Sequence, residues 1–281
     1  MQRGQVVRYG VLGLPLAFGA LPIYIFVPDL YARSGLLGLS VIGLVLLLTR
    51  LLDAVADPLF GWLSDRFPRR LFFYLALVPF LLGFFALFMP SGVAESVPVV
   101  WLSLSLALCT LGFSAAMIAF QSWGGDLGRD SKERLQLTGS REAFILIGVV
   151  IAAVIPSALS DDLTVGMQQL PWFLLAFLAL SLAFAYGLPE GSRPRVTESL
   201  WTQIRTIVKD SIFTRLLLVF FINGVASAFP ATLFVFFVAD VLGVPEMSGL
   251  LLGTYFLAAA ISVPFWVRLA QAIGRPRTWM C

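Results

Sequence analysis

Long apolar runs separated by short polar connections recur along the whole chain. Each run is long enough to cross the ~30 Å hydrocarbon core of a bilayer, which takes about 20 residues of α-helix. The runs are continuously apolar, whereas the strands of a membrane barrel alternate apolar and polar residues over about 10 positions. The pattern therefore predicts eight transmembrane helices. Their expected ranges are Tyr9–Pro28, Leu36–Ser64, Leu71–Pro90, Val97–Trp123, Ala143–Ser160, Leu170–Leu188, Leu216–Ala239 and Met247–Val267.

The composition agrees with this pattern. Of 281 residues, 59% are hydrophobic and only 12% are charged, whereas soluble domains carry about 25% charged residues. The mean hydropathy is +0.92. The sequence has no histidine, which excludes histidine-based catalysis and histidine-ligated metals. We therefore expect an all-α polytopic protein in the lipid bilayer, with no cofactor and no enzymatic activity.

The basic residues are distributed one-sidedly. They precede the first expected helix and fill the connections after helices two, four, six and eight, whereas Arg33 alone lies in the opposite connections. Positive residues in short loops are retained on the cytoplasmic side of a membrane. Both ends of the chain, the N-terminus included, are therefore predicted to be cytoplasmic. The same asymmetry accounts for the net charge of +3, so no nucleic-acid partner is expected.

An internal repeat indicates the architecture. At an offset of 211 residues, "AFGALPIYIFVPD" (Ala17–Asp29) matches "AFPATLFVFFVAD" (Ala228–Asp240) without gaps, and Arg66 falls on Arg277. Two same-direction copies of a six-helix half build a large class of secondary transporters. We therefore expect an N-terminal six-helix bundle at 1–189, a cytoplasmic linker with an amphipathic helix at 190–211, and the first two helices of a second half at 212–281. A complete chain of that design would have twelve helices.

The second expected helix carries charges inside an apolar run. At 100° per residue, a stripe of polar and small side chains shares one face of this helix. A charge at the bilayer centre costs about 2.5 kcal/mol or more, so such residues usually face a bundle interior or a water-filled cavity. One interpretation is a static buried ion pair that orients the helix. The other is a cation site, because one arginine cannot neutralise two carboxylates and oxygen ligands suit Na⁺ or H⁺. The stripe consists of Arg50, Asp53, Asp57, Gly61 and Ser64.

These residues resemble a known family. "RLLDAVADPLFGWLSDR" (Arg50–Arg66) is similar to the helix-two signature of the glycoside–pentoside–hexuronide:cation symporters, the melibiose-permease group of the major facilitator superfamily. "DSKERLQLTGSRE" (Asp130–Glu142) resembles the connection after helix four. The resemblance implies the major facilitator fold, a bacterial inner-membrane location, and a cation site at Asp53 and Asp57 with Arg50 balancing charge.

The sequence also departs from that family at two positions. The resemblance places a further acid in helix four, where alignment on "FQSWGGD" gives Met117. It places a sugar-binding acid in helix one, where this chain has Ala17. Both Na⁺ and H⁺ therefore remain open as the coupling ion.

Other polar residues are candidates for the solute path and for gating. Each has a simpler interpretation as an interhelical hydrogen-bonding residue or as a determinant of topology. For substrate contact or charge balance the candidates are Gln121, Asn223, Tyr24 and Tyr255. For gating, within the loop signature "GWLSDRFPRR" and a mixed-charge loop between helices four and five, they are Gly61, Asp65, Arg66, Arg70, Arg134 and Arg141.

Together these observations predict a monomeric secondary active transporter. We expect symport of a small solute, a sugar or sugar derivative, driven by H⁺ or Na⁺ through alternating access. A lipid-like solute on the same fold is one alternative, favoured by the apolar first helix. A truncated membrane protein that transports nothing is the other.

Overall fold

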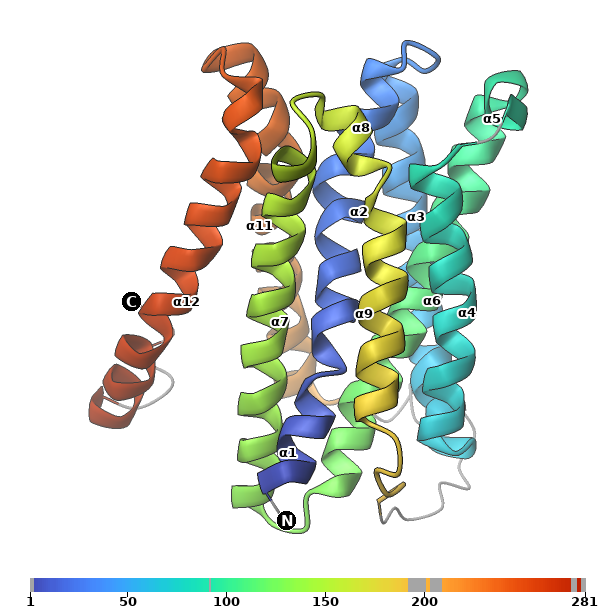
Figure 1. Cartoon of the computed structure of the whole chain (residues 1–281). Coiled ribbons are helices and arrows are strands. Elements are labelled where there is room, and N and C mark those ends of the chain that lie inside the picture. The colour runs from blue at the N-terminus through green and yellow to red at the C-terminus, as the bar shows by residue number, and fades with distance from the viewer. Residues whose placement is uncertain (1–2, 91, 192–200, 203–208, 274–276, 279–281) are drawn as a thin grey trace.

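The structure is a computed structural model that describes residues 3–90, 92–191, 201–202, 209–273 and 277–278. All regular elements in these ranges are helical, as predicted (Figure 1). The first six predicted spans correspond to α1 (Arg3–Gly10) with α2 (Gly13–Arg33), α3 (Leu39–Arg66), α4 (Arg69–Phe88), α6 (Pro98–Leu127), α7 (Ser131–Leu159) and α9 (Leu170–Phe184). The last two correspond to α11 (Ser211–Phe236) and α12 (Ser248–Ile273). Short elements lie between them: α5 (Gly92–Ser96), α8 (Leu163–Met167), the π-helix η1 (Phe237–Val241) and the 3₁₀ turn η2 (Pro245–Met247).

Seven spans in the described residues are long and apolar enough to cross a membrane, and α12 occupies the position of the eighth prediction. The count of eight therefore stays a prediction, while the helical membrane fold is confirmed. The division into an N-terminal bundle, a linker and a partial second bundle also stays a prediction. The expected amphipathic linker helix lies mostly outside the described residues.

The predicted start of the first span is wrong. The chain forms a short helix, turns at Val11 and Leu12, and then continues through Pro22 and Pro28 to Arg33. Pro15 explains the turn, because it has no N–H for the Val11 carbonyl and its ring clashes with that carbonyl.

The mixed-charge loop predicted before the fifth span is also wrong, because most of it is the first part of α7. Asp130 caps this helix by accepting a hydrogen bond from the Glu133 N–H at 2.7 Å. The Glu133 carboxylate in turn accepts one from the Arg129 N–H at 2.9 Å. This reciprocal cap starts the helix well before the apolar residues begin. Lys132, Glu133, Arg134 and Arg141 therefore lie on a helix rather than on a loop.

The two ends of the bundle differ in charge. The end that holds the N-terminus also holds Arg69, Arg70 and Arg134, and is called here the arginine-rich end (Figure 1, bottom). The opposite end carries α5, α8 and η1 and is called the acid-rich end. Its acidic residues are Asp29, Glu95, Asp161, Asp162, Asp240 and Glu246.

Helix α2 lies at the centre of the bundle, with most of its side chains buried. Helices α4 and α6 approach each other closely at two glycines. A Cβ on Gly112 would lie 2.3 Å from the Phe80 nitrogen, and one on Gly83 would lie 2.4 Å from the Cys109 nitrogen. This contact fixes the position of α6, which packs against α3 on its other side.

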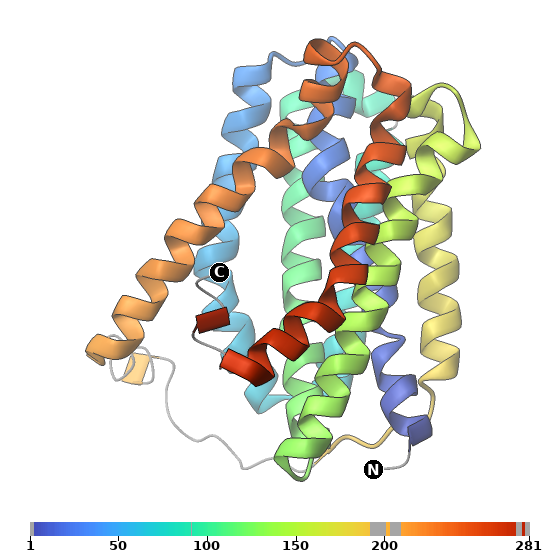
Figure 2. The same ribbon diagram turned by 90° about the vertical axis from the view of Figure 1, so that its left-hand side faces the viewer.

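The second copy of the repeat packs against the first at one end of the bundle more than at the other. Helix α11 packs against α2, and α12 packs against α7. Every side chain from Ser211 to Pro230 is exposed, whereas Val235 and Val238 are buried. Figure 2 shows α11 (orange) diverging from the bundle toward the arginine-rich end. The two copies therefore meet at the acid-rich end and separate at the other.

Candidate functional site

The charged stripe of α3 lies beside α2 and α6, both of which contact α3. Arg50 places its guanidinium carbon 3.7 Å from the centre of the Tyr24 ring on α2. Tyr24 in turn meets Phe113 of α6 edge-on, with ring centres 6.5 Å apart. A cation over an aromatic face is stabilised by the ring quadrupole. Two predicted site residues, Arg50 and Tyr24, are thus brought together.

The spacing of residues along α3 allows Arg50 to pair with either aspartate. In the described part of the chain, no ion pair joins Arg50 to Asp53 or Asp57. Its charge still acts on Asp53 through space. Arg50 therefore offsets negative charge while it stacks on Tyr24, and the carboxylate oxygens of the two aspartates can bind another partner.

Asp57 is held from α6. The Ser114 hydroxyl donates a hydrogen bond to Asp57 Oδ1 across the α3–α6 contact. A hydroxyl that donates to one carboxylate oxygen keeps lone pairs of its own for a second partner. Asp57 and Ser114 together therefore present several oxygen lone pairs at one place.

Asp53 lies one turn earlier on α3, beside Thr110 on α6. The Thr110 hydroxyl acts on the Asp53 carboxylate as a hydrogen-bonding neighbour, although its geometry falls short of a well-formed bond and leaves Asp53 Oδ1 and Thr110 Oγ1, both buried, without a close partner in the described residues. Buried polar atoms are normally paired, so each exception needs an explanation. A carboxylate oxygen and a neighbouring hydroxyl oxygen without close partners fit a hard cation or a proton that binds and leaves.

Two of these residues were missed in the sequence. Thr110 and Ser114 are one helical turn apart, as are Asp53 and Asp57, so each pair lies on one face of its helix. That matching spacing of hydroxyls and acids is the signal in the sequence. It does not reveal by itself which helices pack together.

Three predicted residues lie elsewhere. Gln121 near the end of α6, Asn223 on α11 and Tyr255 on α12 are all exposed. Met117, the expected position of a further acid, is partly buried against the core, and Ala17 is buried. Neither position carries a polar side chain.

The residues predicted for gating on α3 lie near its arginine-rich end. Arg69, which was not singled out, bonds to three side chains there. It donates to Asp65 Oδ1 at 2.8 Å and to Ser64 Oγ at 3.1 Å, and it forms an ion pair with Asp126 of α6. Arg66 instead stacks over the Trp62 ring at 3.9 Å. A Cβ added to Gly61 would meet no neighbouring atom within 4 Å outside its own helix backbone.

Arg70 and Arg134 bond to groups that follow α9 and α6, whereas Arg141 pairs within α7. Arg70 donates to the Leu188 carbonyl at 3.1 Å, and its N–H donates to Glu190 at 3.2 Å. Arg134 donates to the Gly128 carbonyl at 3.2 Å. Arg141 pairs with Glu142, its neighbour in the sequence, at 2.7 Å. The contacts of Arg70 and Arg134 join neighbouring segments at the arginine-rich end of the first bundle.

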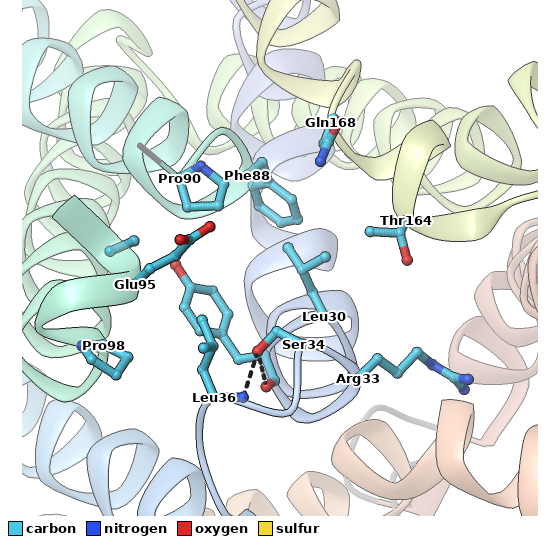
Figure 3. Close-up of a pocket in the computed structure, with 12 residues that line it drawn as sticks. Leu30, Arg33, Ser34, Leu36, Phe88, Pro90, Glu95, Pro98, Thr164 and Gln168 are labelled. Carbon is cyan, nitrogen blue, oxygen red and sulfur yellow. Dashed lines mark hydrogen bonds between the residues drawn. The ribbon is translucent and has the colours of Figure 1, made fainter. Parts of the chain in front are cut away.

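Two cavities of about 340 and 410 Å³ lie near the acid-rich end and are lined by residues other than the two aspartates. Figure 3 shows the first, between the end of α2, the start of α6 and α8, with Leu30, Phe88, Glu95 and Thr164 around it. The carboxylate site is thus a cluster of side chains on α3 and α6, separate from both cavities. We take the cluster as the candidate site because it combines two partly buried carboxylates with oxygens that lack a close partner in the described residues.

Comparison with known proteins agrees with this geometry. Residues 8–281 match the family described as MFS/sugar transport protein. The chain is also similar to the inner membrane symporter YicJ of Escherichia coli (strain K12), with 22% identity over 253 residues, covering 85% of this chain and 53% of that protein. The chain thus spans about half the length of this curated relative. It belongs to the MFS/sugar transport protein family, a family of membrane transporters rather than of enzymes.

Proposed function

We propose that this protein is a secondary active transporter that couples H⁺ or Na⁺ to the movement of a small solute by alternating access. The observation that carries the proposal is the cluster of Asp53, Asp57, Thr110 and Ser114 between α3 and α6. It places two carboxylates and two hydroxyls together in a membrane-spanning region, and the one nearby arginine is engaged with Tyr24. The relative's description as a symporter supports coupled transport.

Each residue of the cluster has a chemical role in this proposal. Na⁺ would bind to carboxylate and hydroxyl oxygens, as hard cations do. A proton would bind to one carboxylate, which the neighbouring negative charge favours. Arg50 offsets one of the two negative charges, so that one cation brings the cluster close to neutrality. The protein can then change between its two conformations at a lower electrostatic cost than with a charged cluster in the membrane.

The arrangement of the two repeats supports alternating access. Because basic residues favour the cytoplasmic side, we place the arginine-rich end and the N-terminus there, in a bacterial inner membrane. The repeats meet at the acid-rich end and separate at the arginine-rich end (Figure 2). This arrangement is in keeping with a state that opens toward the cytoplasm, as the proposal of alternating access requires.

The solute is proposed to be a sugar or a sugar derivative, in keeping with the family description. Ala17 provides no polar group for hydroxyl recognition at the position where the resemblance expects a sugar-binding acid. A lipid-like solute is the second candidate, and the apolar first helix favours it.

The test is uptake by the purified protein in proteoliposomes, with neutral sugars, sugar acids and lysolipids offered under an imposed Na⁺ or H⁺ gradient. We expect accumulation of at least one solute only when a cation gradient is present. Uptake that merely equilibrates each solute, with or without either gradient, would contradict coupled transport. Accumulation of a lysolipid but of no sugar would show that the solute is lipid-like.

A further inference from the structure

The cavity of about 340 Å³ at the acid-rich end has the properties of a small-molecule site. Such sites have volumes of about 300–1,000 Å³, and apolar and aromatic side chains line them together with a few polar groups. Figure 3 shows both kinds of side chain around this cavity. Its apolar lining residues are Leu30, Leu36, Phe88, Pro90, Ala94 and Pro98.

Hydrogen bonds fix the walls of the cavity. The Tyr31 hydroxyl of α2 donates to the Leu87 carbonyl of α4 at 3.3 Å, and the Ser34 hydroxyl donates to the Tyr31 carbonyl at 2.8 Å. In the wall formed by α8, the Asp162 side chain accepts a hydrogen bond from the Thr164 N–H at 2.8 Å and caps that helix. The cavity is therefore preformed, and a ligand that enters it does not have to order these walls first.

The position of the cavity separates it from a path between the repeats. Every described residue that lines it lies between Leu30 and Gln168, in the part of the chain that precedes α11. Transporters built from two repeats bind their solute at the interface between the repeats, and that interface changes shape as the repeats rock. A cavity lined from one side of the interface keeps its shape during such a movement.

Two charged side chains line the cavity, and only one of them is neutralised. Arg33 pairs with the buried Asp29, whose two oxygens lie 2.7 and 2.8 Å from Arg33 Nε. Among the described residues, the Glu95 side chain forms no ion pair. In Figure 3, Glu95 points toward Phe88 and Leu30, whereas Arg33 points away from both. The cavity therefore contains one negative charge without a counter-ion in the described part of the chain.

This charge and the lining together favour a cationic ligand. Asp161 and Asp162 lie just before α8 and add to the negative potential at this end. Aromatic rings such as that of Phe88 attract cations that lie over their faces. An anion would be repelled by Glu95, since complementary charge selects between ligands of the same shape.

We propose that this cavity is a binding site for a small hydrophobic organic cation, in which the apolar residues hold the body of the ligand and Glu95 balances its charge. The inference goes beyond the proposed transport function, because the cavity is separate from the carboxylate cluster of α3 and α6. An aromatic body that carries a quaternary ammonium group has the chemistry that this lining selects.

The test is calorimetric titration of the purified protein in phosphatidylcholine nanodiscs with two probes of similar size and opposite charge. Benzyltrimethylammonium is the cation and phenylmethanesulfonate is the anion. Titration of empty nanodiscs corrects for the part of each probe that enters the lipid. We expect saturable binding of the cation, with a dissociation constant at least tenfold below that of the anion.

Two variants place the cation in the cavity. Glu95→Gln should weaken its binding by about two- to fivefold, the range for an exposed charge pair. Glu246→Gln is the matched control, since it removes the same charge from the same end at a position outside the cavity lining, and it should leave the affinity unchanged. Thr164→Phe fills the cavity from a partly buried wall position and should abolish binding.

The absence of saturable cation binding, or equal affinities for the two probes, would overturn the proposal. Equal effects of Glu95→Gln and Glu246→Gln would do the same, because the charge would then act from a distance. Unchanged cation binding in a folded Thr164→Phe protein would place the probe outside the cavity. Glu95 is exposed, so its replacement leaves the fold intact and the comparison with Glu246→Gln decides even where Thr164→Phe does not fold.

Discussion

Two aspartates one helical turn apart share one face of α3, and a hydroxyl of α6 lies beside each of them. The periodicity of the sequence predicts the stripe that contains Asp53 and Asp57. It does not predict Ser114, because a serine in an apolar helix has many possible partners and most bond to their own backbone. Ser103 on the same helix does so, donating to the Val99 carbonyl at 2.7 Å. Packing of α6 on α3 is what distinguishes the two serines.

That difference leads to the first prediction. Ser114→Ala should weaken the apparent affinity for the coupling ion by about tenfold or more, because a hydrogen bond to a charged group contributes about 1.5–3 kcal/mol. Ser114→Thr keeps the hydroxyl and should retain most of the affinity. The measurement is the cation concentration that gives half-maximal solute uptake.

Ser103→Ala is the matched control, since its hydroxyl bonds only within its own helix. It should leave the cation dependence unchanged. If Ser114→Ala and Ser103→Ala give the same half-maximal concentration as the unmodified protein, Ser114 has no part in the ion site.

The expected role of Arg50 changes for a similar reason. Sequence spacing allows it to reach either aspartate, and only the position of α2 shows that Tyr24 takes the guanidinium instead. Long arginine side chains have many rotamers, so spacing along one helix cannot decide between partners on that helix and partners across a contact.

At the scale of helices, the contact between α4 and α6 determines the position of Ser114. Gly112 lies against the Phe80 backbone, two residues before Ser114. Gly112→Val should therefore force the helices apart and lower the free energy of unfolding by about 1–3 kcal/mol, the usual effect of overpacking. The measurement is thermal unfolding of the purified protein in detergent.

Gly125→Val serves as the control for α6, because nothing lies within 4 Å of the Cβ that it would add. It should change stability by less than Gly112→Val. Equal loss in both variants would mean that valine on this helix, rather than the α4 contact, is responsible.

The arginine-rich end gives a second prediction at this scale. Arg69→Gln removes the cation that links Asp65 of α3 to Asp126 of α6. The pairs are only partly buried, so we expect a loss of about 1–2 kcal/mol in unfolding free energy rather than the larger penalty of a fully buried pair. Arg66→Gln, which removes only a stacking contact with Trp62, should have a smaller effect in the same unfolding assay.

Helix positions were predictable from the apolar runs, but helix ends were not. The cap formed by Asp130 and Glu133 extends α7 through charged residues that hydropathy assigns to a loop. At the other extreme, Pro15 breaks the first span inside an apolar run. Both ends are decided by backbone hydrogen bonds, which average hydropathy does not measure.

At the scale of the whole molecule, the repeat at an offset of 211 residues predicts that α11 and α12 follow the course of the first helices. The structure adds that, among the described residues, the two copies touch at the end where Asp29 and Asp240 lie and separate toward the other. The sequence repeat alone could not show where the two copies touch. Open and closed arrangements use the same helices and differ only in how the copies tilt.

The central claim is that the two aspartates couple a cation to solute movement. Its most direct test compares Asp57→Asn with the unmodified protein in proteoliposomes, in two assays on the same preparation. One is solute accumulation driven by a Na⁺ or H⁺ gradient, and the other is exchange of labelled for unlabelled solute without a gradient. Asp162→Asn, at the exposed cap of α8, is the matched control. We predict that Asp57→Asn loses accumulation and retains exchange, while Asp162→Asn keeps both. Gradient-driven accumulation that survives in Asp57→Asn would contradict the account.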